Sequence, residues 1–226
     1  MRLAQAAKRD PAARNVHIAD RLCEAGRLGR KSGAGYYRYP EGAVRPQPDP
    51  AVAALIAREH AATQAHMGAE IARTTAPITS YFALARDDAS VQVVAEAQRE
   101  HAKKLLKGTP HEGLPLLSAA APIKTGGRGG ANYYTDIPAG PIATRNVADL
   151  YVYPNTVQVV RLKGAQVREW LEMSAGAFNR IAPAGAPEQN LINSGFPSFN
   201  FDTLDGVSYR IDVTQPARYE RSGKLV

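Results

Sequence analysis

The stretch TVQVVRLKGAQVREWLEMSAGAF, residues 156–178, places a β-branched run directly before an amphipathic helix. Its first seven residues, 156–162, are typical of a strand, because β-branched side chains fit a pleated, half-buried surface. Residues 163–178 follow the helical period. The apolar side of this helix is formed by Val167, Trp170, Leu171 and Ser174. A strand followed at once by a helix indicates a fold that mixes both element types.

The flanking sequence continues this mixture. Helices are predicted at residues 18–25 and 51–67, and again after Asp88, which can accept the free N–H groups at a helix start. Further strands are predicted at 114–122 and 207–213, the second from its period-two alternation. Because helices and strands do not alternate strictly, we expect an α+β fold of layered mixed sheets with helices, preceded by a small irregular and helical segment.

Charge and proline content divide the chain near residue 50. The net charge of +7 arises mainly in residues 1–50, which hold ten Lys/Arg and five Asp/Glu. The segment RPQPDP, residues 45–50, has three prolines in six residues and is typical of an extended linker. We therefore predict two parts, residues 1–50 and residues 51–226, whose different charge balance indicates different origins.

Composition excludes several classes of protein. Cys23 is the only cysteine, so neither an intrachain disulfide nor a cysteine-based metal site can form. No run approaches the ~18 apolar residues of a membrane-spanning helix, and no apolar core of a secretory signal follows the basic N-terminus. From this sequence we expect a cytoplasmic chain with no membrane partner.

No complete catalytic centre is found. Two-metal phosphoesterases need clustered Asp, His and Asn ligands, and the five histidines here are scattered without metal-ligand spacing. The stretch GRLGRKS lacks the glycine that a phosphate-binding loop needs directly before its lysine, because Arg30 stands there. We therefore expect no catalytic residues, no metal site and no other cofactor in this chain.

Residues 122–130, PIKTGGRGG, form the first candidate binding feature. Four glycines let backbone N–H groups approach a ligand closely, while Lys124 and Arg128 carry charge suited to phosphate. An ordinary surface loop explains the same residues, so both interpretations stay open.

Residues 150–156, LYVYPNT, form the second candidate. Pro154 and Asn155 predict a tight turn that presents Tyr153 beside the Asn155 amide. An aromatic face that stacks and an amide that hydrogen-bonds to an edge suit a nucleobase. The alternative is a hairpin turn with buried tyrosines.

Five long stretches resemble one enzyme family. They are ITSYFALARDDASVQVVAEAQ, LPLLSAAAPIKTGGRGG, IATRNVADLYVYPNT, GAQVREWLEMSAGAFNRI and INSGFPSFNFDTLDGVSYRIDVTQPARY. Through them, residues 58–226 resemble the C-terminal domain of bacterial 2′,3′-cyclic-nucleotide 2′-phosphodiesterase/3′-nucleotidases, a branch of the 5′-nucleotidase family. The resemblance implies a part in nucleotide catabolism by phosphoester hydrolysis, with a 3′-nucleotide or a 2′,3′-cyclic nucleotide as the ligand.

The resemblance also implies roles for individual residues. In the family, an N-terminal domain holds two divalent metal ions and hydrolyses the phosphoester, while the C-terminal domain binds the nucleoside. Tyr153 matches the aromatic residue that stacks on the base, Asn155 matches a neighbouring amide, and Arg128 matches an arginine that faces the ligand. Lys124 is a weaker match. The metal-binding domain and the family's second stacking aromatic residue are absent from this sequence, so we expect a truncated domain that binds nucleotide weakly and is inactive alone; intact members of the family are periplasmic.

Residues 1–50 resemble a different family. The stretch DRLCEAGRLGRKSGAGYYRYPEG resembles the C-terminal helical domain of 3-hydroxyacyl-CoA dehydrogenases, enzymes of fatty-acid oxidation, without their NAD domain or catalytic His/Glu pair. This combination predicts a chimeric chain. Two alternative functions stay open, a dehydrogenase fragment and, least favoured, a nucleic-acid-binding protein. The cations that motivate the second alternative are Arg27, Arg30, Lys31 and Arg38, which alternate with three tyrosines.

Overall fold

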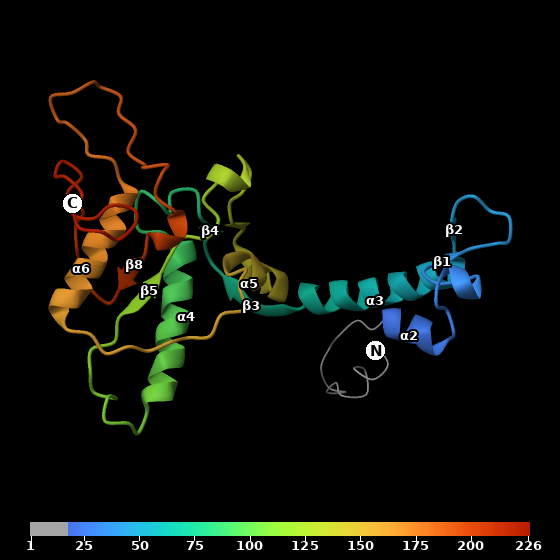
Figure 1. The fold of residues 1–226 in the computed structure, drawn as a ribbon. Helices are drawn as coiled ribbons and strands as arrows, with labels where there is room; N and C mark the ends of the chain where they lie inside the picture. Colours follow the sequence, from blue (N-terminus) through green and yellow to red (C-terminus); the bar gives the residue numbers. More distant parts are fainter. Residues whose placement is uncertain (1–17) are drawn as a thin grey trace. The chain divides into compact units, whose positions relative to one another are not determined.

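The computed structural model describes residues 18–226, with the side chain of Arg128 excepted. It divides into two compact units, one that ends at Ala69 and one that spans Glu70–Val226. Figure 1 traces the chain from blue at the N-terminus to red at the C-terminus. The division falls at the end of a long helix, so this helix belongs with the first unit.

In its described residues, 18–69, the first unit contains two helices and a short hairpin. Its elements are α2 (Ile18–Glu24), a 3-10 turn (Arg30–Ser32), β1 (Tyr37–Arg38), β2 (Gln47–Pro48) and α3 (Pro50–Gly68). The strands β1 and β2 pair in antiparallel fashion. Both helices confirm the predictions for this part of the chain. α3 begins where Asp49 accepts a hydrogen bond from the Ala51 N–H at 3.0 Å, with Pro50 in the first turn, where its missing N–H costs nothing.

Asp49 organises the first unit. Its side chain is 1% exposed and forms ion pairs with Arg27 and Arg38, the second with 3.2 Å between Arg38 Nε and Asp49 Oδ2. Arg27 also donates a hydrogen bond to the Gly35 carbonyl at 2.9 Å. The Arg27 guanidinium, assisted by Arg38, lowers the pKa of Asp49 to about 2. The hairpin and the start of α3 are therefore joined by one ionised carboxylate.

The second unit combines three helices with three two-stranded antiparallel sheets in its described residues. The strand pairs are β3 (Glu70–Thr74) with β7 (Gly140–Ala143), β4 (Ile78–Thr79) with β6 (Asp136–Ile137), and β5 (Ser118–Ala120) with β8 (Thr203–Asp205). The helices are α4 (Ala89–Leu106), α5 (Thr144–Leu150) and α6 (Gly164–Ser174). Further 3-10 turns span Gly127–Gly129, Ala175–Ala177 and Ser198–Asn200. This mixture of helices and small sheets confirms the predicted α+β class.

The helix α4 confirms the predicted start after Asp88. Asp88 accepts a hydrogen bond from the Ser90 N–H at 3.0 Å and so caps the helix, as expected. Near the end of the helix, Leu105 is 54% exposed. Leu106, one residue later, lines the inner side of the unit instead.

Small apolar clusters hold the second unit together. α4 contributes to the first, which contains Ala83, Val91, Ala95 and Ala120. The second contains Ile78, Ile137 and Leu150, and the third contains Ala177, Phe196 and Phe201. The second cluster positions the end of α5, because Leu150 is its last helical residue. The chain leaves α5 at a fixed point, immediately before the candidate turn.

Two of the predicted strands are wrong and a third is shorter than expected. Residues 156–162 and 207–213 contain no strand, and only Ser118–Ala120 of the run 114–122 is one. Strand propensity mainly reflects packing against neighbouring strands, so an alternating run becomes a strand only where a second segment lies beside it. In the described part of the chain, residues 156–162 have no backbone hydrogen bond to another segment, and residues 207–213 have only the one that the Ile181 N–H donates to the Val213 carbonyl at 2.8 Å.

Candidate functional site

The glycine-rich loop follows β5, and two of its glycines make room for tyrosines of the same chain. A Cβ on Gly126, whose φ is 71°, would lie 2.5 Å from Tyr134 Oη. A Cβ on Gly129 would lie 2.2 Å from Tyr133 Cδ1. Both positions therefore need glycine so that these rings can reach the loop backbone. Packing against tyrosines therefore explains Gly126 and Gly129 without a ligand.

The other two glycines of the loop face open space. Gly127 and Gly130 have φ of 59° and 97°, and an added Cβ would meet nothing within 4 Å at either position. Their backbone remains accessible to a ligand from that side. Arg128 lies between them, and its side chain is outside the described part of the structure. The loop thus has one face packed on tyrosines and one open face.

Lys124 is held inside the protein. Its Nζ forms an ion pair with Asp149, and it lies 5.4 Å from the centroid of the Tyr133 ring. The Lys124 side chain is 17% exposed. Because a carboxylate already neutralises this ammonium group, its charge is less available to a phosphate than the sequence alone indicates. The ion pair instead ties the loop to the end of α5.

The turn after α5 presents one tyrosine to solvent. Tyr153 is 59% exposed, which contradicts the alternative of a turn with this tyrosine buried. The Asn155 N–H donates to the Tyr153 carbonyl at 2.9 Å, and Asn155 Nδ2 donates to Tyr151 Oη at 3.0 Å. The amide side chain is thereby held beside Tyr153, and its carbonyl oxygen has no hydrogen bond to a described residue. An open aromatic face and an oriented amide lie on the same turn.

Two residues that the sequence did not single out connect these features. Asp149 binds Lys124 and, through its carbonyl, accepts a hydrogen bond from Thr135 Oγ1 at 3.3 Å. Ser80, 3% exposed, donates to the Lys124 carbonyl and accepts from the Thr135 N–H at 2.8 Å. Asp149 lies four residues before Tyr153, so these bonds join the loop to the turn. No short-range spacing could have shown this, because Lys124 and Asp149 are 25 residues apart.

A cavity of about 790 Å³ lies elsewhere in the second unit. Its walls include residues 114–119 and 156–162, together with α4, Trp170 and Asp202. Trp170 Nε1 donates to Asp202 at 2.8 Å, and burial raises the pKa of Asp202 against the smaller opposite effect of that hydrogen bond. Neither Tyr153 nor the glycine-rich loop lines this cavity. The candidate site, formed by the glycine-rich loop and the turn with Tyr153, therefore lies outside this cavity.

The described residues do not fit a metal centre. Nowhere in residues 18–226 do three or more His, Cys, Asp or Glu side chains gather closely enough to hold an ion. The two metal ions of the family resemblance therefore find no ligand set in this part of the chain, and no chemical step is derived through them. The described residues also contain no helix of the length and hydropathy that a membrane crossing requires.

Comparison with known proteins identifies the family of the second unit. Residues 70–224 match the family described as 5′-nucleotidase, C-terminal domain. The chain therefore belongs to the 5′-nucleotidase family and carries its C-terminal domain. The matched residues nearly coincide with the second compact unit.

The relatives are much longer proteins. A trifunctional nucleotide phosphoesterase of Bacillus subtilis is 52% identical over 171 residues, which are 76% of this chain and 12% of that relative. A 2′,3′-cyclic-nucleotide 2′-phosphodiesterase/3′-nucleotidase of Haemophilus influenzae is 44% identical over 181 residues, 79% of this chain and 28% of that relative. The corresponding protein of Salmonella typhimurium is 43% identical over the same length. No solved structure matches the chain.

The comparisons give no support to the dehydrogenase resemblance of residues 1–50, so that resemblance and the chimeric origin stay predictions. The structure bears on the nucleic-acid alternative. Of the four cations that motivated it, Arg27 and Arg38 bind Asp49, and the Arg30 guanidinium lies 5.2 Å from the Tyr39 ring centroid. Three of the four thus have partners within the first unit, and the Asp49 carboxylate offsets one of their positive charges.

Proposed function

We propose that the second unit recognises a nucleotide for a phosphoester-hydrolysing enzyme of the 5′-nucleotidase family. The ligand is a 3′-nucleotide or a 2′,3′-cyclic nucleotide, the substrate class in the names of two of the relatives. The observation that carries the proposal is the exposed Tyr153 on one turn with Asn155. In this arrangement Tyr153 stacks on the base and Asn155 hydrogen-bonds to its edge.

The glycine-rich loop provides the phosphate side of the proposed site. Arg128 and the Gly127 N–H contact the phosphate, because N–H groups and a guanidinium suit its oxygens, whereas the Gly130 N–H already donates to the Gly127 carbonyl at 3.0 Å. Lys124 has a smaller part, since it must first leave Asp149 to reach a ligand. The described residues gather no cluster of metal ligands, so we assign hydrolysis to a separate metal-binding domain and expect this chain alone to be inactive.

The affinity of this half-site is low. One base stack contributes ~1–3 kcal/mol and one charged hydrogen bond ~1.5–3 kcal/mol. Together these barely reach the ~4 kcal/mol that correspond to a millimolar dissociation constant. We expect 3′-AMP to bind the full chain with a dissociation constant of about 1 mM or weaker. Micromolar binding would contradict this estimate.

A titration with 3′-AMP followed by NMR chemical shifts tests the site. Tyr153→Ala weakens binding by about 5- to 150-fold, because the stacking contribution is lost. Tyr36→Ala is the matched control, since Tyr36 is 49% exposed and lies in the first unit; it leaves binding unchanged. Equal effects of the two substitutions would exclude Tyr153 as the base contact. In parallel, phosphate release from 2′,3′-cyclic AMP with added Mn²⁺ stays at background, and turnover that persists through repurification would contradict the assignment of hydrolysis to another domain.

A further inference from the structure

Residues 156–162, TVQVVRL, form an extended run that lacks a backbone partner. They lie between α5 and α6, where Figure 1 shows an extended trace. None of their backbone N–H or C=O groups bonds to another backbone group among the described residues. Val159 is 43% exposed and Val160 is 64% exposed. Backbone polar groups are strong donors and acceptors, and an apolar, unpaired run of this kind is a template for a further strand.

The cavity of about 790 Å³ lies directly along this run. All seven residues of the run line it, and residues 114–119 form a facing wall. Most of the remaining lining is apolar, including Leu106, Val167 and the Trp170 ring. The cavity is therefore a groove with a strand-like wall, and it is separate from the loop and turn of the proposed nucleotide site.

The size of the groove suits a short strand. Neighbouring strands are about 4.8 Å apart, stacked layers are about 10 Å apart, and each residue adds about 3.3 Å, so five residues fill on the order of 800 Å³. A compact small molecule could occupy a similar volume. It would leave most backbone groups of the seven-residue wall unpaired, whereas an extended peptide pairs with them in sequence.

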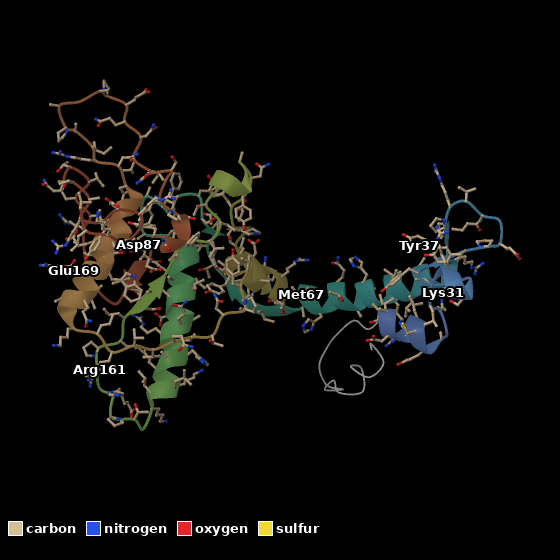
Figure 2. All side chains as sticks on the ribbon, viewed as in Figure 1. Lys31, Tyr37, Met67, Asp87, Arg161 and Glu169 are labelled. Carbon is tan, nitrogen blue, oxygen red and sulfur yellow. The ribbon has the colours of Figure 1, made fainter. Side chains whose placement is uncertain are left out.

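The charge at the groove indicates the chemistry of the peptide. Arg161, labelled in Figure 2, lies on the run, and Lys163 follows it immediately. Neither forms an ion pair with a described residue. Asp202, an acidic group of the lining, is already hydrogen-bonded to Trp170. The uncompensated charge beside the run is positive, so acidic residues on the occupant are favoured.

We propose that this groove binds an extended, apolar peptide strand with an acidic end from another polypeptide chain. The strand pairs with residues 156–162 through backbone hydrogen bonds, places alternate apolar side chains on Leu106 and Trp170, and directs its acidic end towards Arg161. None of this requires the nucleotide site, so either proposal can fail without the other.

The first test uses the full chain and a fluorescent heptapeptide, Glu-Val-Thr-Val-Thr-Val-Glu. We expect saturable binding in fluorescence anisotropy, and at least tenfold weaker binding of the same peptide with all interior amides N-methylated, because several backbone hydrogen bonds are lost while the side chains stay. A peptide with Lys at both ends binds several-fold more weakly at low salt. No binding up to millimolar peptide, or equal binding of the N-methylated form, would overturn the proposal.

Two proline variants test the pairing from the side of the protein. Successive N–H groups of an extended run point to opposite edges, so Val159→Pro and Val160→Pro remove donors from different edges. Neither N–H has a backbone partner in the described structure, so both variants keep the thermal melt of the wild type. One variant weakens peptide binding about tenfold more than the other. Equal effects would contradict pairing along one edge.

A last measurement identifies the source of the strand. Analytical ultracentrifugation of the chain without peptide shows a monomer over the concentrations used. A dimer that Val160→Pro or the heptapeptide dissociates would mean that a second copy fills the groove, and the proposal of a different polypeptide would then be wrong.

Discussion

The turn at residues 150–155 and the run at 156–162 are consecutive in sequence but differ in how they are held. Leu150 is 8% exposed and packs on Ile78 and Ile137, and Asn155 is fixed by two hydrogen bonds. The run that follows has no backbone partner in the described part of the chain. The turn is thus set by contacts with distant segments, whereas the conformation of the run depends on its own propensity.

Tyr153 and Val160 are both exposed, but for different structural reasons. Tyr153 is exposed on a fixed support, which is what a binding residue needs, because an ordered side chain loses little entropy when a ligand arrives. Val160 is exposed because nothing covers it. The ordered Tyr153 side chain is suited to a small ligand, and the uncovered Val160 is suited to a polypeptide. The apolar cluster that supports the turn can be removed by mutation.

The largest expected effect comes from the cluster beneath the turn. Ile137→Ala removes a side chain that is 1% exposed and costs about 2–5 kcal/mol of unfolding free energy. Urea unfolding followed by Trp170 fluorescence measures it, since this single tryptophan lies in the second unit. Val160→Ala is the control and changes the free energy by less than about 0.5 kcal/mol. A similar loss of unfolding free energy in both variants would show that the turn is no better supported by packing than residues 156–162.

A smaller effect is expected in the glycine-rich loop. Gly129→Ala forces its new methyl group against the Tyr133 ring and costs about 1–3 kcal/mol, and it weakens 3′-AMP binding because the loop must move. Gly113→Ala meets nothing within 4 Å and leaves stability unchanged or slightly raised. Trp170 fluorescence melts compare the two. A neutral Gly129→Ala would show that the tyrosine contact does not support the loop.

The smallest effect concerns the ion pair between loop and turn. A double-mutant cycle with Lys124→Met and Asp149→Asn gives a coupling free energy of about 1 kcal/mol, because both side chains are only partly exposed. The same cycle with Lys103→Met and Glu100→Gln, an exposed helical pair, gives about 0.3 kcal/mol. Coupling at Lys124 no larger than at Lys103 would mean that the pair does not hold the loop to α5.

All described helices except α5 were predicted from the sequence, whereas most of the described strands were not. A helix carries its own signals, such as Asp88 before α4 and the apolar period of α6, and these signals are local. A strand exists only with its partner, and the partner of β5 is β8, which the sequence separates by more than 80 residues. The β-branched run at 156–162 and the alternation at 207–213 therefore predicted strands that do not form, because neither run pairs with a second strand in the described residues.

The candidate site was predictable at the level of residue type but not of availability. Tyr153 and Asn155 do lie together, because their proximity depends on a local turn. Lys124 was expected to meet a ligand, and nothing nearby in sequence indicated that Asp149 would neutralise it. Whether a charged side chain is free to bind a ligand depends on long-range contacts that the sequence does not show. Arg27 and Arg38 are a second example, because both pair with Asp49.

The single carboxylate of Asp49 has a consequence for how the first unit opens. Its ionised form bonds the hairpin arginine, caps α3 and binds Arg27, which itself holds Gly35. Its lowered pKa stabilises the folded unit above about pH 4, and that stabilisation disappears as the pH falls towards 2. Protonation releases all these bonds in one event, so the hairpin and the first turn of α3 lose their hydrogen-exchange protection together, as one cooperative segment.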